Sequence, residues 1–220
     1  MSLDNRSPEL FGQTPWQTVG PFFHTSLPWK GGADLIGSSG IGARPDLIPE
    51  GHDLLRQQGA RGAIAGQVID ITGFVLDGEG APVPDALLEL WQANAAGRYN
   101  SPADPREAIP LEADFTGFGR AATGEDGGYR FRTILPGRVP GPGNSLQAPH
   151  AALGVLGRGL LKRLVTRIYF EDGDGNDDDP VLALAPADRR GTLIARRGGG
   201  ATYRFDIHLQ GEHETVFFDV

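Results

Sequence analysis

The heptapeptide Gly128-Tyr129-Arg130-Phe131-Arg132-Thr133-Ile134 alternates strictly, with Tyr129, Phe131 and Thr133 on one face and arginines on the other. This period of two predicts a β-strand with one buried face. Further strands, separated by glycine- and proline-containing turns, are expected at residues 64–76, 86–92, 163–170, 201–209 and 214–218. One short helix is expected at about residues 187–196. Many short strands, frequent turns and little helix predict an all-β chain built as a β-sandwich.

Composition and charge narrow the class of protein. The chain has 220 residues, a formal net charge of −8 and no cysteine. An acidic chain without a basic stripe repels phosphate backbones, so no nucleic-acid partner is expected. No apolar run approaches the ~20 residues of a membrane span, and no basic and apolar leader is visible. Absence of cysteine excludes disulfides and fits a reducing compartment. We therefore expect a cytoplasmic protein with no membrane contact.

The first 60 residues differ from the rest because they show little periodicity. They carry Trp16, Phe22, Phe23 and Trp29, and exposing four large aromatic side chains is unfavourable. Such a segment is expected to dock on another surface. We therefore divide the chain into an N-terminal arm, residues 1–60, that docks on a partner subunit, and a β-sandwich domain, residues 61–220.

The histidines are scattered and form no sequence-local metal motif. His208 and His213 lie across an expected hairpin turn together with Glu212 and Glu214. Two histidines and one carboxylate can bind non-haem iron, so this cluster is one candidate metal site. Against it, His208 falls on the strand face opposite Ile207, where an exposed histidine is the ordinary case.

Two segments carry a resemblance to a known family. They are Leu90-Trp91-Gln92-Ala93-Asn94-Ala95-Ala96-Gly97-Arg98-Tyr99 and Ala148-Pro149-His150-Ala151-Ala152. Both are similar to metal-site segments of the intradiol ring-cleavage dioxygenases, whose first segment reads WQANAxGRY. Residues 14–22, 117–120, 130–137 and 203–207 are similar to further motifs of that family. The resemblance covers essentially the whole chain and implies the family's transthyretin-like β-sandwich with little helix.

The resemblance implies an incomplete metal site. In the family's catalytic chains, two tyrosines and two histidines hold a ferric ion. Tyr99 stands at the first tyrosine and His150 at the first histidine, but Val139 replaces the second tyrosine and Ala152 the second histidine. Valine and alanine offer no donor atom, whereas ferric iron needs hard ligands that offset its charge. The four positions are therefore read as vestigial, with no metal and no catalytic residue on this chain.

The resemblance then implies a non-catalytic alpha subunit in an obligate hetero-oligomer with an iron-bearing beta subunit. On this analogy, Thr18, Gly20, Pro21 and Arg158 line the substrate cleft over the beta chain's Fe(III). The complex would open 3,4-dihydroxybenzoate (protocatechuate) with O2 between its hydroxylated carbons. The product would be 3-carboxy-cis,cis-muconate, within the beta-ketoadipate route of aromatic catabolism.

Two other functions stay open at this stage. The first is a stand-alone transthyretin-like module that binds a small molecule without a partner. The second is a self-sufficient iron dioxygenase whose ligands have moved to residues such as His208 and His213.

Overall fold

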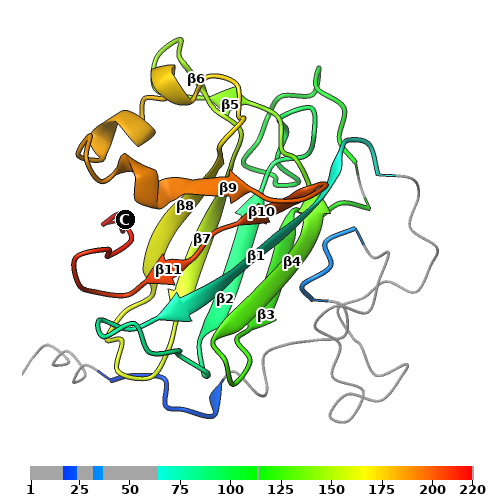
Figure 1. Ribbon diagram of the computed structural model, residues 1–220. Helices are drawn as coiled ribbons and strands as arrows, with labels where there is room; N and C mark the ends of the chain where they lie inside the picture. The colour runs from blue at the N-terminus through cyan, green and yellow to red at the C-terminus, as the bar shows by residue number, and fades with distance from the viewer. Residues whose placement is uncertain (1–16, 24–31, 37–63, 113, 220) are drawn as a thin grey trace, which may run out of the picture.

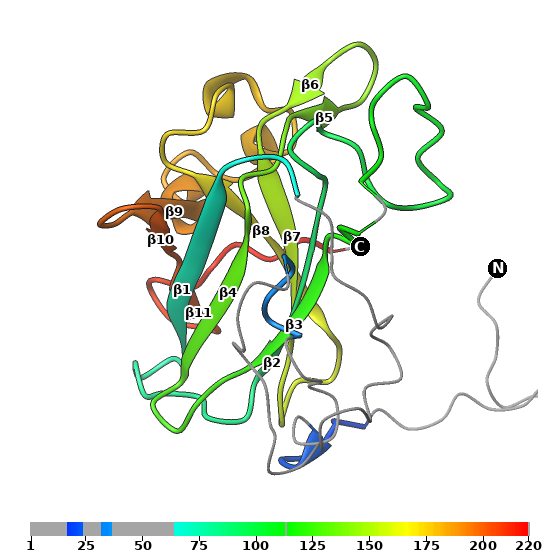
Figure 2. The same cartoon turned by 90° about the vertical axis from the view of Figure 1, so that its right-hand side faces the viewer.

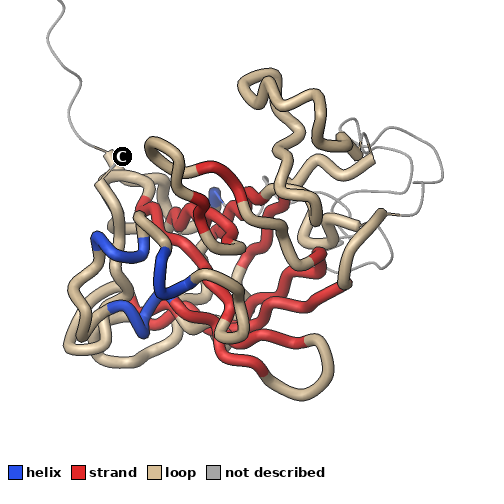
Figure 3. The backbone as a smooth tube through the Cα atoms, turned by 90° about the horizontal axis from the view of Figure 1, so that it is seen from above, coloured by secondary structure: helices blue, strands red, loops and turns tan. Residues whose placement is uncertain are grey.

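The computed structural model of the chain describes residues 17–23, 32–36, 64–112 and 114–219 (Figure 1). Its strands are β1 Val68–Leu76, β2 Leu87–Gln92, β3 Phe118–Ala122, β4 Gly128–Ile134, β5 Val139–Pro140, β6 Leu146–Gln147, β7 His150–Leu156, β8 Leu164–Phe170, β9 Ile194–Arg197, β10 Thr202–Arg204 and β11 Ile207–His208. Three single-turn 3-10 helices are η1 Asn176–Asp178, η2 Leu182–Leu184 and η3 Arg190–Leu193. They gather on one flank of the strands (Figure 3). None of the helical segments among these residues has the length and apolarity to cross a bilayer.

The expected all-β class is confirmed, but the arrangement of the strands differs from two separate layers. Nine strands form one continuous sheet in the order β11-β1-β10-β9-β8-β7-β2-β3, with β4 paired to β1. Figures 1 and 2 show β1, β4 and β10 on one side of the molecule and β2, β7 and β8 on the other. The sheet therefore curls round one core and is nearly barrel-like. The short β5–β6 hairpin stands apart from it.

A piece of the N-terminal segment covers the open edge between β3 and β4. The N–H of Leu35 donates to the carbonyl of Arg132 in β4, and the Arg132 N–H donates to Ala33, both at 2.8 Å. The N–H of Arg120 in β3 donates to Gly32 at 2.8 Å. Ala33 and Leu35 are buried in the main core. These contacts nearly close the curled sheet, because the short segment bonds to both of its free edges.

Alternation along the strands fills the core as the sequence predicts. Tyr129, Phe131 and Thr133 of β4 are all buried. In β2, Leu88 and Leu90 are buried, whereas Glu89 and Trp91 are only half-buried. The main core collects 22 buried residues from all the long strands. A smaller cluster, built on Tyr169 and Leu182, lies under the 3-10 helices.

The helix expected at residues 187–196 is wrong. Only Arg190–Leu193 form a helical turn, and the chain continues into β9. Ile194 and Ala195 pair in parallel with Tyr169 and Phe170 of β8. Backbone pairing to β8 and burial of Ala195 therefore override the local helix preference, because helix propensity is worth less than 1 kcal/mol per residue.

The strand expected at residues 201–209 is interrupted, and the one at 214–218 is reduced to a single bridge between Phe218 and Val165. Both β10 and β11 pair in parallel with β1. Between them, the N–H of Phe205 donates to the carbonyl of Thr72 at 2.8 Å, and Asp206 accepts the N–H of Phe74 at 3.1 Å. The break keeps Tyr203, Phe205 and Ile207 buried on one side of the chain, as expected.

Candidate functional site

Tyr99 and His150 line one cavity at the end of the sheet where β7 begins. Its volume is about 350 Å³. We call it the Tyr99–His150 pocket, and its lining residues are Trp91, Tyr99, Ser101, Ala103, Asp104, Pro105, Arg106, Val139, Pro140, Gln147, His150 and Arg167. Three of the four positions taken from the resemblance, at 99, 139 and 150, therefore meet in one place.

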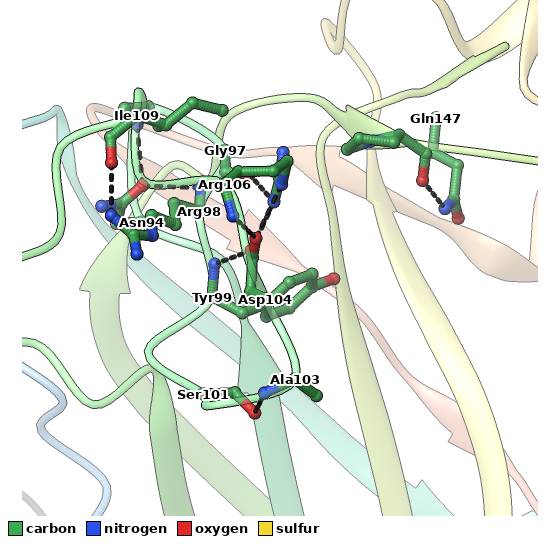
Figure 4. A network of polar contacts seen from close by, with 12 residues as sticks. Asn94, Gly97, Arg98, Tyr99, Ser101, Ala103, Asp104, Arg106, Ile109 and Gln147 are labelled. Atoms are coloured by element: carbon green, nitrogen blue, oxygen red, sulfur yellow. Dashed lines mark hydrogen bonds and ion pairs between the residues drawn. The ribbon is translucent and has the colours of Figure 1, made fainter. Parts of the chain in front are cut away.

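The loop after β2 fixes Tyr99 through Asn94 (Figure 4). The Asn94 Oδ1 accepts the N–H groups of Ala96 at 3.1 Å and Arg98 at 2.9 Å, and its Nδ2 donates to Pro110 at 2.9 Å. Gly97 has a φ of +81° and packs against the Arg138 backbone, so only glycine fits. This turn explains why the WQANAxGRY motif has an asparagine and a glycine before its tyrosine.

An ion pair then holds the loop that follows. The Arg106 Nε donates to Asp104 Oδ1 at 2.8 Å, and the same carboxylate accepts the Tyr99 N–H at 2.9 Å. The hydrogen bond to Arg106 holds the pKa of Asp104 well below its usual range. The Tyr99 ring stacks on Trp91 with centroids 5.8 Å apart and planes 10° from parallel. Burial raises the pKa of Tyr99, so its phenol keeps its proton at neutral pH.

His150 is held as a neutral imidazole at the start of β7. Its Nδ1 lies 2.8 Å from the Ala148 carbonyl oxygen, so this nitrogen carries the proton and donates. Burial, with a contribution from the Arg167 charge, lowers the pKa of His150 to about 4. Beneath it, the buried Asp179 accepts the Ala148 N–H at 2.7 Å and the Tyr169 hydroxyl at 3.0 Å. The histidine therefore presents Nε2 to the pocket as a hydrogen-bond acceptor, and the hydrogen bonds of Asp179 hold the residues beneath it in place.

The lining does not fit a ferric ion. Val139 is apolar and buried, and Ala152 pairs with Trp91 and Arg167, which line the pocket from the neighbouring strands. Cross-strand partners share a face, so position 152 faces the pocket with a methyl group beside a guanidinium. The remaining donors are one protonated phenol and one imidazole, and Arg167 adds a positive charge that opposes a cation.

The alternative cluster at the C-terminal end is also incomplete. The rings of His208 and His213 lie 6.0 Å apart. In the part of the chain that the structure describes, no three histidine or carboxylate side chains are grouped so that they could hold a metal ion. The relocated-ligand hypothesis therefore has no geometric support.

The second set of predicted residues lies at the opposite end of β7. Arg158 follows β7, and its Nε lies 3.1 Å from Asp85 Oδ2. The N–H of the next residue, Gly159, donates to Thr18 Oγ1 at 2.8 Å. The structure thus brings Thr18 and the Arg158 loop together, and Gly20, with a φ of +56°, and exposed Pro21 follow on the same segment. Figure 1 shows this segment, residues 17–23 in blue, at the end of the molecule away from β5 and β6.

Several pocket residues were missed from the sequence. Asp104 and Arg106 lie in a loop without periodicity. Asp179, which supports Ala148 and Tyr169 without lining the pocket, sits in an acidic run that reads as a solvated loop. Arg167 alternates with buried Thr166 and Ile168 in β8, and this alternation is the one signal that places it on the face opposite the core. Its position beside Ala152 depends on the register of β7 and β8, which a single sequence does not give.

Similarity of sequence and of fold places the chain in a known enzyme class. A dioxygenase family model matches residues 45–211, and the chain belongs to the intradiol dioxygenase family. It is 40% identical over 216 residues to the protocatechuate 3,4-dioxygenase alpha chain of Burkholderia cepacia. That alignment covers 94% of this chain and 98% of the relative. The beta chain of the same enzyme is 39% identical over 179 residues, covering 77% of this chain and 76% of that one.

A solved structure supports the same assignment of the fold. The 3-chlorocatechol 1,2-dioxygenase of Rhodococcus opacus superposes with a TM-score of 0.53 at 27% identity. The match covers 67% of this chain and 61% of that chain. The resemblance predicted from the sequence motifs is confirmed.

Proposed function

We propose that the chain is the non-catalytic alpha subunit of a protocatechuate 3,4-dioxygenase. With a beta subunit, it opens 3,4-dihydroxybenzoate between its hydroxylated carbons, and both atoms of O2 enter the product, 3-carboxy-cis,cis-muconate. The similarity to a named alpha chain over nearly the whole length of both proteins supports this function. So does the absence of donor atoms at Val139 and Ala152. We place the complex in the cytoplasm and class the curled sheet as a variant of the transthyretin-like sandwich.

The ferric ion belongs, in this proposal, to the beta subunit, and this chain completes the substrate cleft over it. The observation that carries the proposal is the 2.8 Å hydrogen bond from the Gly159 N–H to Thr18 Oγ1. It joins the arm to the Arg158 loop on one surface, and the same two segments expose Phe22 and Leu161 at 79% and 58%. An exposed apolar surface beside a cation suits contact with a partner and an anionic substrate.

Arg158 has a definite role in this arrangement. Its side chain is 60% exposed, and the 3.1 Å contact of Nε with the buried Asp85 fixes the base of the guanidinium. Both terminal nitrogens are then left to receive the substrate carboxylate, because a guanidinium can pair with a carboxylate through two parallel hydrogen bonds.

Replacing Arg158 in the complex tests the proposal. Arg158→Gln keeps a polar side chain but removes the charge. In a co-expressed αβ complex we expect the KM for 3,4-dihydroxybenzoate to rise about tenfold or more, with kcat little changed. The KM for catechol, which has no carboxylate, should not change. Lys162→Gln removes an exposed charge from the same loop and serves as the matched control.

Two results would contradict the proposal. One is a chain that forms no complex with any beta subunit. The other is an Arg158→Gln complex whose KM values match those of Lys162→Gln. Stoichiometric iron with a visible tyrosinate-to-iron band in the isolated chain would also exclude a metal-free alpha subunit.

A further inference from the structure

The Tyr99–His150 pocket has no task in the proposed function, which places the shared site at the far end of β7. Its volume of about 350 Å³ nevertheless falls within the ~300–1,000 Å³ of ordinary ligand pockets. The loop that forms one wall is held by the bonds of Asn94, Asp104 and Arg106 described above. A loop fixed in this way makes the cavity a formed feature of the fold.

One guanidinium of the lining, that of Arg167, has no carboxylate at ion-pair distance among the described residues. Arg167 Nη1 donates to Gln147 Oε1 at 2.5 Å and lies 3.4 Å from the Tyr169 hydroxyl. Within the described residues, no Asp or Glu oxygen lies at ion-pair distance from Arg167, although Arg106 in the same lining is paired with Asp104. The buried carboxylate of Asp179 accepts hydrogen bonds from the Tyr169 hydroxyl and from three backbone N–H groups. A half-buried guanidinium without a counter-charge favours an anionic ligand.

Besides the polar side chains of Ser101, Asp104, Arg106 and Gln147, the lining contains aromatic and apolar groups. The rings of Trp91 and Tyr99 are stacked nearly parallel, and Val139 and Pro140 add apolar surface to the lining. In the described part of the chain, neither the Tyr99 hydroxyl nor His150 Nε2 makes a hydrogen bond, whereas His150 Nδ1 is engaged by Ala148. A flat ring fits such walls better than an inorganic ion does, because aromatic side chains stack on planar ligands.

We propose that the Tyr99–His150 pocket is a metal-independent site for a small aromatic carboxylate, with the guanidinium of Arg167 supplying the positive charge. The carboxylate pairs with Arg167 and accepts a hydrogen bond from the Tyr99 hydroxyl. A hydroxyl on the ligand ring donates to His150 Nε2. The ligand is bound and not transformed, and the site does not depend on the beta subunit.

Calorimetric titration of the full chain with benzoate, 4-hydroxybenzoate and phenol, in phosphate-free buffer with EDTA, tests this site. We expect one benzoate per chain, tighter binding of 4-hydroxybenzoate, and no measurable binding of phenol. Arg167→Gln should weaken benzoate binding about tenfold to a hundredfold, the range of a charge-assisted hydrogen bond. Arg196→Gln, which removes an exposed arginine outside the pocket, should leave the affinity unchanged.

A conservative variant guards against loss of folding. Tyr99→Phe keeps the ring that stacks on Trp91 and should weaken benzoate binding about threefold to tenfold. If the chain is purified only with its partner, the titrations use the complex. The difference in benzoate binding between the wild-type and Arg167→Gln complexes then reports on this pocket alone, because any binding site on the partner is present in both complexes. Failure of the Arg158 experiment leaves these titrations unaffected.

Three outcomes would overturn the inference. The first is no saturable benzoate binding at millimolar concentration. The second is equal affinity in wild type and Arg167→Gln. The third is displacement of benzoate by sulfate at the same concentration, which would indicate a general anion site without aromatic selectivity.

Discussion

His150 is a buried titratable group whose effect on stability has a definite sign. Its pKa falls from the ordinary 6.5 to about 4 on folding. Between these values the unfolded chain takes up a proton that the folded chain does not, so stability is lost as the pH falls from 6.5 to 4. The cost at pH 4 is about 3 kcal/mol relative to neutral pH. Urea unfolding of His150→Gln across this range should lack that loss.

The exposed His213 offers the control for this measurement. His213→Gln removes an imidazole that lies outside the Tyr99–His150 pocket, and so controls for the substitution itself. Parallel curves for wild type and His150→Gln would show that His150 titrates normally in the folded chain.

At the same scale, the sequence predicted part of the site and missed part. Tyr99, Val139 and His150 could be found because each lies in a local motif whose spacing the chain preserves. Arg167 could not, because its place depends on pairing with Ala152 across two strands. The position of this charge in the pocket is therefore a tertiary property, which no local pattern records.

Gly73 and Gly154 lie in different strands, and a methyl group added to each by substitution with alanine should lower the stability by different amounts. The difference depends on how tightly the neighbouring elements pack against each glycine. A Cβ at Gly73 of β1 would overlap the backbone carbonyl of Phe205 between β10 and β11. The atoms nearest to a Cβ at Gly154 of β7 belong to the end of the Arg163 side chain, which is 47% exposed and can move. Gly73→Ala should therefore lower the free energy of unfolding by about 3 kcal/mol or more. Gly154→Ala should change it by less than about 1 kcal/mol in either direction.

Denaturant unfolding of the two variants measures this difference directly. Equal destabilisation by both would show that the β1–β10–β11 contact is not as tight as the backbone geometry indicates. Replacement at Gly199, in an exposed turn with space around it, is the neutral comparison.

Prediction of the strands succeeded for β4, one face of which meets solvent, and failed for β7, which is buried along most of its length. β4 alternates and was found at its observed bounds. β7, with the sequence HAALGVL, is buried along most of its length and lies between β2 and β8. A strand covered on both faces reads as a continuous apolar run without a period of two. β9 was missed for a different reason: it has four residues, and its pairing to β8 is parallel and distant in sequence.

The whole molecule depends on its C-terminal strands because the sheet is continuous. β10 lies between β1 and β9 in the sheet, and it thereby joins two strands that are far apart in the sequence. The side chains of Tyr203, Phe205 and Ile207 belong to the main core. Ending the chain after Arg197 removes these side chains and separates β1 from β9. We expect loss of the cooperative thermal transition and of near-UV circular dichroism, and not fraying of one edge.

Insertion of two glycines after Gly199 distinguishes loss of the strands from disturbance of the turn before them. Residues 198–200 are exposed, and lengthening a surface loop costs less than about 1 kcal/mol. The insertion variant should therefore keep a single transition close to the wild-type Tm. A truncated chain that unfolds cooperatively at that same Tm would mean that β1 to β9 close a core without β10 and β11. Dependence on the last strands is the expected behaviour of a sheet in which strands distant in sequence complete the core, because their contacts form late and together.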